Sequence, residues 1–158
     1  AAHAAGLRAR AKLPPRGSRS YFGGRPVNYR RPADTFYAAE DARTRCFPMI
    51  ETPSSLDEVE AIAALDVVDG LFPGPSDLAL SSGRGTYRCD ETDQAAIVRC
   101  AQAARRSGKA WIMPGWTPQE RALAVAHGAT EVVVSTQFML IRNGIESLQR
   151  TLQAEGIA

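Results

Sequence analysis

The stretch GLFPGPSDL, residues 70–78, decides the fold of this chain. A short apolar run leads into a turn rich in proline and glycine, and a helical pattern follows, which is the order of elements in a βα unit. The stretch CFPMIE, residues 46–51, shows the same order. Each stretch therefore predicts a strand with an acid at its carboxyl end, Asp77 in the first and Glu51 in the second. Two carboxylates on neighbouring parallel strands can share one divalent cation.

The alternation of strands and helices continues along the chain. In addition to the strand that ends at Glu51, we expect strands over residues 67–73, 109–113 and 131–135, the last fully buried. Residues 74–82 are predicted to form the turn that carries Asp77. Helical spacing predicts helices over residues 34 to 43 or 45, from 53 onward, from 93 to 107, from 118 to 127 and from 137 to 155. An interruption of the last helix at residues 143–144 is left open.

Several helix ends have recognisable signals. Asp34 and Asp93 fit the N-cap positions of two helices. The sequence TPQE, residues 117–120, is typical of a capping box, and Gly128 fits a helix end. His127 stands just before that glycine, so we expect it to interact with terminal carbonyls rather than to bind a metal.

Four βα units in a row predict an α/β fold with a parallel sheet. They amount to half of a (β/α)8 TIM barrel, which needs about 200 to 250 residues when complete. We therefore predict that residues 1–158 form one partial TIM-barrel domain, with an open sheet as the alternative. Within this domain, residues 1–12 are expected to be helical, and residues 13–33 to form a loop rich in proline, glycine and arginine.

Composition argues against several classes of protein. With 44% hydrophobic and 23% charged residues the chain resembles a soluble globular protein, and no apolar run approaches the roughly 18 residues of a membrane span. We expect a cytoplasmic protein with no membrane partner. Three cysteines without Cys-x-x-Cys spacing argue against a disulfide framework or a zinc site, and His3 and His127 are too few for a His-rich metal site. The motifs of phosphate-binding loops and serine hydrolases are absent.

Charge is distributed unevenly. Residues 1–31 contain eight basic and no acidic side chains, whereas residues 32–158 contain 11 basic and 17 acidic ones. Such a basic arm could bind nucleic acid or an anionic substrate. Because no nucleic-acid recognition motif accompanies these charges, we favour a solvated or partner-facing surface and predict no nucleic-acid partner.

Four pieces of the sequence resemble the HpcH/HpaI family of metal-dependent pyruvate aldolases, which includes 2-dehydro-3-deoxyglucarate aldolase. The pieces are PPRGSRS at 14–20, MIET at 49–52, VDGLFPGPSDL at 68–78 and HGA at 127–129. They occur in the family's order, and Glu51 and Asp77 are 26 residues apart, as in the family (77 − 51 = 26). The resemblance implies that the chain forms the C-terminal half of a TIM barrel.

The resemblance also implies a site. Glu51 and Asp77 would bind Mg²⁺, Mn²⁺ or Co²⁺, and the backbone amides of Ser76 and Asp77, which Gly74 makes accessible, would receive the carboxylate of a 2-oxo acid. Met113 would line the aldehyde side of the pocket. Two carboxylates without nearby cysteine or histidine are suited to a hard cation that keeps open positions. Such a cation stabilises the enolate that forms when a carbon–carbon bond breaks.

The function implied is an aldolase that cleaves a 4-hydroxy-2-oxo acid to pyruvate and an aldehyde, acting as a homo-oligomer. The chain departs from the family at Met49, where many members have glutamine. The family's proton-transferring histidine and its carboxylate-binding arginine have no match here, so no catalytic residue is assigned. Two alternatives remain open: an acyl-CoA lyase of the citrate-lyase β type, which the basic arm would serve, and a non-catalytic half-barrel that needs a partner.

Overall fold

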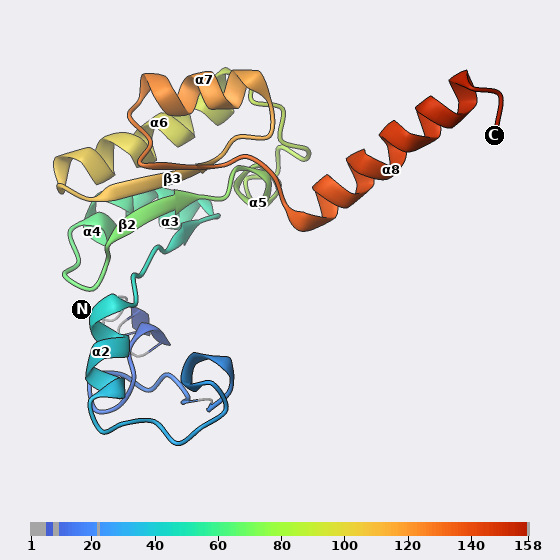
Figure 1. Cartoon of the computed structure of the whole chain (residues 1–158). Helices are drawn as coiled ribbons and strands as arrows, with labels where there is room; N and C mark the ends of the chain where they lie inside the picture. Colours follow the sequence, from blue (N-terminus) through green and yellow to red (C-terminus); the bar gives the residue numbers. More distant parts are fainter. Residues whose placement is uncertain (1–5, 8–9, 22, 158) are drawn as a thin grey trace.

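The computed structural model describes residues 6–7, 10–21 and 23–157. Of the helix predicted over residues 1–12, the described residues 6–7 and 10–11 are helical, and His3 lies outside the described residues. Figure 1 shows an N-terminal part containing helix α2, a sheet with its covering helices, and the helix α8, which extends away from both. In the predicted loop, the described residues 13–21 and 23–33 contain one short 3-10 helix, η1 (Arg25–Val27), and are otherwise irregular.

Strands and helices alternate as predicted. The strands are β1 (Met49–Ile50), β2 (Gly70–Pro73), β3 (Ala110–Pro114) and β4 (Glu131–Val133). The helices are α2 (Phe36–Arg43), α3 (Pro53–Asp57), α4 (Val59–Ala63), α5 (Pro75–Ser81), α6 (Glu91–Arg106), α7 (Pro118–Ala126) and α8 (Gln137–Ala154). All three strand pairs are parallel and the sheet order is β1-β2-β3-β4. Four successive parallel βα units are the arrangement of half a (β/α)8 barrel, which confirms the predicted fold class.

The sheet has one covered face and one open face. Ile50 of β1 has no exposed surface, whereas Met49 beside it is 46% exposed. Successive residues of a strand point to opposite faces, so the alternation identifies the two sides. Leu71, Trp111 and Met113 are buried on the covered side, and Phe72 and Ile112 are half-buried on the open side. In a complete barrel the open side would be the interior.

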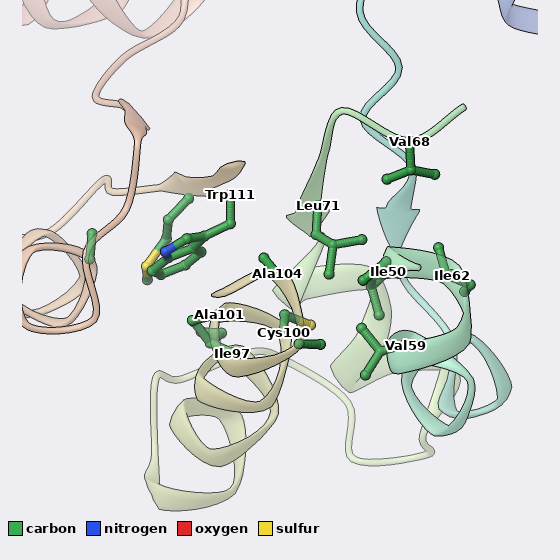
Figure 2. Packing of buried hydrophobic residues seen from close by; sticks show 14 of the residues in the cluster. Ile50, Val59, Ile62, Val68, Leu71, Ile97, Cys100, Ala101, Ala104 and Trp111 are labelled. Carbon is green, nitrogen blue, oxygen red and sulfur yellow. The ribbon is translucent and has the colours of Figure 1, made fainter. Parts of the chain in front are cut away.

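The hydrophobic core lies between the covered face and the helices. Figure 2 shows Ile97 and Cys100 of α6 directed toward Leu71 of β2, with Val59 of α4 beside Ile50. Burying a large apolar side chain of this kind contributes about 1.5–3 kcal/mol. Burial also raises the pKa of the Cys100 thiol to about 12. The three cysteines are free, as the sequence indicated.

The start of helix α6 differs from the prediction. Asp90, and not Asp93, is the N-cap, and its carboxylate accepts a hydrogen bond from the Asp93 amide at 2.9 Å. Asp93 lies one turn into the helix, where it is 3% exposed and pairs with the Arg84 guanidinium. It also accepts a hydrogen bond from the Arg88 amide at 2.9 Å. Burial alone would raise the pKa of Asp93, but these hydrogen bonds outweigh it and the pKa is lowered.

Three other elements differ from the expectation, and a fourth answers a point that the sequence left open. The helix from residue 53 is divided at Glu58 into α3 and α4. Residues 75–81 form helix α5 rather than a turn. Strand β4 is only partly buried, because helix α8 extends away instead of covering it. Helix α8 itself runs through residues 143–144 without a break.

The helix signals in the sequence are otherwise confirmed. Thr117 and Glu120 form the capping box of α7, and α7 ends at the His127 C-cap, with Gly128 following at a φ of 69°. Asp34 is the exception, because the N-cap of α2 is the next residue, Thr35, which forms no side-chain capping hydrogen bond. No helix in the described part of the chain is both long and apolar enough to cross a membrane.

The Asp93–Arg84 pair yields a prediction about acid stability. Replacing Asp93→Asn should lower the free energy of unfolding by roughly 2 kcal/mol at pH 7, because Arg84 loses the nearer of its two acidic partners. In the folded protein the pKa of Asp93 lies below the ordinary value of about 3.9. At a pH between the folded and the unfolded pKa, Asp93 therefore binds more protons in the unfolded chain than in the folded protein. The contribution of Asp93 is therefore complete above the ordinary pKa and is lost as the pH falls through the native one.

Urea denaturation between pH 7 and pH 3 measures this effect. The difference between the wild type and Asp93→Asn should shrink below about pH 4. Glu91→Gln is the control, since Glu91 is an exposed acid in the same helical turn. A difference that stays constant over the whole pH range would contradict the assignment.

Candidate functional site

Glu51 directly follows strand β1 and lies on the open face of the sheet. Phe47, Met49 and Glu51 alternate with Ile50, which is buried on the covered face, so the three share the open side. Two glycines of the β2 segment accommodate these side chains. A Cβ atom on Gly70 would lie 2.3 Å from the Phe47 ring, and a Cβ atom on Gly74 would lie 2.6 Å from Glu51 Cγ. Glu51 therefore crosses from β1 to the end of β2.

The backbone around Glu51 is held from three directions. The Gly74 amide donates a hydrogen bond to the Ile50 carbonyl at 3.0 Å, which continues the β1–β2 pairing. The Ser81 hydroxyl, at the end of α5, donates to the Glu51 carbonyl at 2.6 Å. On the other side, Thr52 caps α3 through a reciprocal pair of hydrogen bonds with Ser55. These contacts determine where the Glu51 side chain begins.

Ser76 and Asp77 lie in the first turn of helix α5, which starts directly after Gly74. The first hydrogen bond within the helix is from the Leu78 amide to the Gly74 carbonyl at 2.9 Å. The amides of Ser76 and Asp77 precede it and have no acceptor within the helix. Pro75 is compatible with this first turn because it has no N–H to leave unpaired.

A cavity of about 350 Å³ adjoins Asp77. It is lined by Ser76, Asp77, Leu80, Gly85, Thr86 and Tyr87. The loop that carries the last three is held by the Arg84–Asp93 pair described above. Burial raises the pKa of Tyr87, and the nearby Cys89 thiol and Glu120 carboxylate raise it further, so this phenol stays protonated.

The structure brings most of the predicted site residues to one edge of the sheet. Glu51 and Gly74 are in contact, and Ser76 and Asp77 follow Gly74 within one helical turn. Among the residues that the structure describes, neither Glu51 nor Asp77 forms an ion pair, and no three His, Cys, Asp or Glu side chains gather as a metal site would. Glu51 does not line the cavity beside Asp77.

Met113 lies near the carboxyl end of β3 but on the opposite face of the sheet from Glu51. Met113 and Trp111 are two residues apart on strand β3, so their side chains point to the same, covered face of the sheet. There Met113 has no exposed surface and belongs to the hydrophobic core. The residue of β3 that points to the open face is Ile112. Met113 therefore packs between sheet and helices rather than lining a pocket on the open side.

Sequence reasoning missed three residues of this region. Ser81 holds the Glu51 backbone, and Thr86 and Tyr87 form a wall beside Asp77. Nothing local marks a helical serine as a backbone anchor. For the loop the available signal was the Gly83-Arg84-Gly85 sequence, whose two glycines have φ values of 71° and 75° and so allow a sharp return toward Asp77.

Comparison with known proteins gives a consistent result. The family model described as HpcH/HpaI aldolase/citrate lyase matches residues 1–138. A 5-keto-4-deoxy-D-glucarate aldolase of Klebsiella pneumoniae is 29% identical over 140 residues, which cover 89% of this chain and 55% of that protein. A 4-hydroxy-2-oxo-heptane-1,7-dioate aldolase of the same species is 34% identical over 142 residues, covering 87% of this chain and 52% of that protein.

A solved structure shows the same likeness. A HpcH/HpaI aldolase/citrate lyase family protein from Burkholderia cenocepacia superimposes with a TM-score of 0.76 and 26% sequence identity, over 94% of this chain and 60% of that one. The chain thus spans about half the length of the curated relatives it matches.

The contact between Gly74 and Glu51 can be tested by a double-mutant cycle. Gly74→Ala should lower the free energy of unfolding by about 1–3 kcal/mol, because the added methyl overlaps Glu51 Cγ. The three nearest atoms to the added methyl all belong to the Glu51 side chain. In a Glu51→Ala background the cost of Gly74→Ala should therefore fall by more than half.

Chemical denaturation of the four proteins in this cycle measures the coupling. Gly144→Ala is the matched control, because no atom lies within 4 Å of the methyl it adds and alanine favours the interior of helix α8. Equal costs of Gly74→Ala in both backgrounds would show that Glu51 does not lie against Gly74.

Proposed function

The chain belongs to the HpcH/HpaI aldolase/citrate lyase family, and we propose that its protein is a divalent-metal-dependent aldolase that cleaves a 4-hydroxy-2-oxo acid to pyruvate and an aldehyde. Relatives named as aldolases of keto-deoxy-glucarate and of hydroxy-oxo-heptanedioate support this reaction class. Both names denote oxo acids with more than one carboxylate, which supports a sugar-derived or dicarboxylic substrate.

The observation that carries the proposal is the contact between Glu51 and Gly74. It places an acid from the end of β1 against the residue that begins helix α5, three positions before Asp77. Two acids from neighbouring strands are thus held at the carboxyl edge of the sheet, where barrels of this kind have their active sites. Neither acid has a basic partner among the described residues, so both carboxylates are available to a cation.

The donor set fits a hard divalent cation such as Mg²⁺, Mn²⁺ or Co²⁺. Glu51 and Asp77 offer only oxygen atoms, and the described residues add no third acid, cysteine or histidine that would close the coordination sphere. A cation held by two carboxylates keeps positions for water and substrate. When bound, it would supply Lewis-acid stabilisation of the negative charge that develops on the keto oxygen.

The chain's own groups would orient the substrate. The free amides of Ser76 and Asp77 can donate hydrogen bonds to a carboxylate, and their position at the start of α5 favours negative charge. Because Gly74 has no side chain, Glu51 can lie against the residue that directly precedes these amides. Met49 offers no hydrogen bond at the position where many family members have glutamine.

Proton transfer is not assigned to any residue of this chain. His127 ends helix α7 near the start of strand β3, where its carbonyl accepts a hydrogen bond from the Trp111 indole at 3.2 Å. The start of β3 lies at the edge of the sheet opposite to Glu51. We therefore assign metal binding and oxo-acid binding to this chain, and proton transfer to none of its residues.

Metal dependence tests the proposed function. The full-length protein should release pyruvate from 2-keto-3-deoxy sugar acids when Mn²⁺ is present, and at least 100-fold more slowly after the metal is removed, because a Lewis acid supplies several kcal/mol of stabilisation. Glu51→Gln and Asp77→Asn should each weaken Mn²⁺ binding at least tenfold, measured by electron paramagnetic resonance of free Mn²⁺. Glu155→Gln, on the last turn of the chain, is the control.

Two results would contradict the proposal. One is an equal rate with and without metal. The other is turnover of malyl- or citramalyl-CoA without turnover of free oxo acids, which would favour the acyl-CoA lyase. Mn²⁺ binding by the full-length protein without cleavage of any of these substrates would favour a non-catalytic domain.

We also propose that the protein is a homo-oligomer, with helix α8 in the interface. The apolar residues Phe138, Ile141, Ile145, Leu148 and Leu152 recur at alternating steps of three and four, which is the seam of a coiled coil. The first four are more than half exposed. Figure 1 shows α8 standing away from the sheet.

Sedimentation can test the role of α8. Ile145→Asp should weaken association at least tenfold, since burying one such side chain contributes about 1.5–3 kcal/mol. Asn143→Asp adds the same charge to the same helix outside the stripe and should leave the oligomer intact. An unchanged sedimentation coefficient for Ile145→Asp would exclude α8 from the interface.

A further inference from the structure

We propose that a cavity at the amino edge of the sheet binds the phosphate group of a small organic phosphate. The cavity has a volume of about 550 Å³ and lies between the ends of helices α6 and α7. It is lined by Ala101, Gln102, Arg105, Lys109, Trp111, Val125, Ala126, His127 and Gly128. Glu51 and Asp77 are at the carboxyl edge, so this cavity is separate from the proposed aldolase site.

The charge of the lining points to an anionic ligand. Arg105, Lys109 and His127 contribute to the wall, and none of the lining residues is acidic. In the part of the chain that the structure describes, Arg105 forms no ion pair, although its neighbour Arg106 pairs with Glu60 at 2.9 Å and Arg99 pairs with Glu60 at 3.3 Å. Arg105 is therefore the cation of this helix that is left without an acid.

Lys109 is held in place by the fold. Its ammonium group donates a hydrogen bond to the Val68 carbonyl at 2.7 Å, which fixes the half-buried side chain across the start of β2 and β3. An ammonium group has three N–H donors, so two remain after this bond. An ordered cation costs a ligand less entropy than a free surface lysine does.

The helix dipoles oppose anion binding at this edge but do not outweigh the side chains. Helices α6 and α7 both end here, and each C-terminus carries about half a negative charge. Three of the last four carbonyls of each helix already accept a hydrogen bond. The donors are the amides of Ser107, Gly108 and Lys109 at the end of α6, and those of His127, Gly128 and Ala129 at the end of α7. Two full positive charges, from Arg105 and Lys109, exceed what remains.

Size and lining define the ligand further. A phosphate group alone would leave most of 550 Å³ empty, and pockets of this size usually hold small organic molecules. Ala101, Val125 and Ala126 supply an apolar side next to the Trp111 indole. A phosphate monoester, with close to two negative charges and a compact apolar body, matches both halves of the cavity.

Calorimetric titration of the full-length protein tests this site. Phenyl phosphate and inorganic phosphate are the probes, at constant ionic strength and with EDTA present so that no cation at Glu51 and Asp77 can hold them. We expect one saturable site per chain, with phenyl phosphate bound more tightly than inorganic phosphate. Arg105→Gln should weaken binding at least tenfold, and Arg150→Gln, which removes an exposed arginine from helix α8, should change it less than twofold.

A second variant separates binding from folding. Gln102→Trp fills the cavity from the exposed surface of α6 without changing its charge, so it should also abolish binding. Equal affinity in the wild type and Arg105→Gln, no saturable binding, or full binding by Gln102→Trp would each overturn the proposal. Because the titration uses metal-free protein and no oxo acid, its outcome is independent of whether the protein is an aldolase.

Discussion

The architecture depends on the close approach of strands β1 and β2 at two glycines. Gly70 receives the Phe47 ring and Gly74 receives the Glu51 side chain, and a Cβ atom at either position would lie within 2.6 Å of these neighbours. Both glycines face the open side of the sheet. A parallel sheet is normally covered on both faces, and here side chains from β1 cover the start and the end of β2 themselves. Packing against Gly74 therefore determines where the Glu51 side chain lies, whether or not a ligand is bound.

The acidic and the basic side chains of the two proposed sites lie at opposite edges of the sheet. Glu51 and Asp77 are at the carboxyl edge, whereas Arg105, Lys109 and His127 line a cavity at the amino edge. The ion pair between Arg45 and Glu131, at 3.1 Å, joins the segment before β1 to strand β4 across the open face. This pair neutralises one basic and one acidic side chain at the amino edge. A net charge of only +2 hides this separation.

Features that depend on residues close together in the sequence could be predicted. The order of four βα units follows from hydrophobic periodicity, and the capping box of α7 follows from four adjacent residues. The prediction of Asp93 as the N-cap of α6 was wrong, because Asp90 also fits a cap and Asp93 instead binds Arg84 and the Arg88 amide of the preceding loop. Met113 was misplaced because its face depends on the register of β3. The basic cavity draws on three separate elements, so no motif marks it.

The open face also limits what these four units can do by themselves. Asp77 is exposed and Glu51 is only half-buried, so water reaches both carboxylates. Interactions with developing charge are strong only where water is excluded and the groups are fixed beforehand. Phe72, Ile112 and the half-exposed Met49 leave an apolar surface directly below these acids, and helix α8 presents a second one. Protein packed against the first surface would bury these apolar side chains. The same contact would exclude water from Glu51 and Asp77, so burial of the open face and formation of a dry site would occur together.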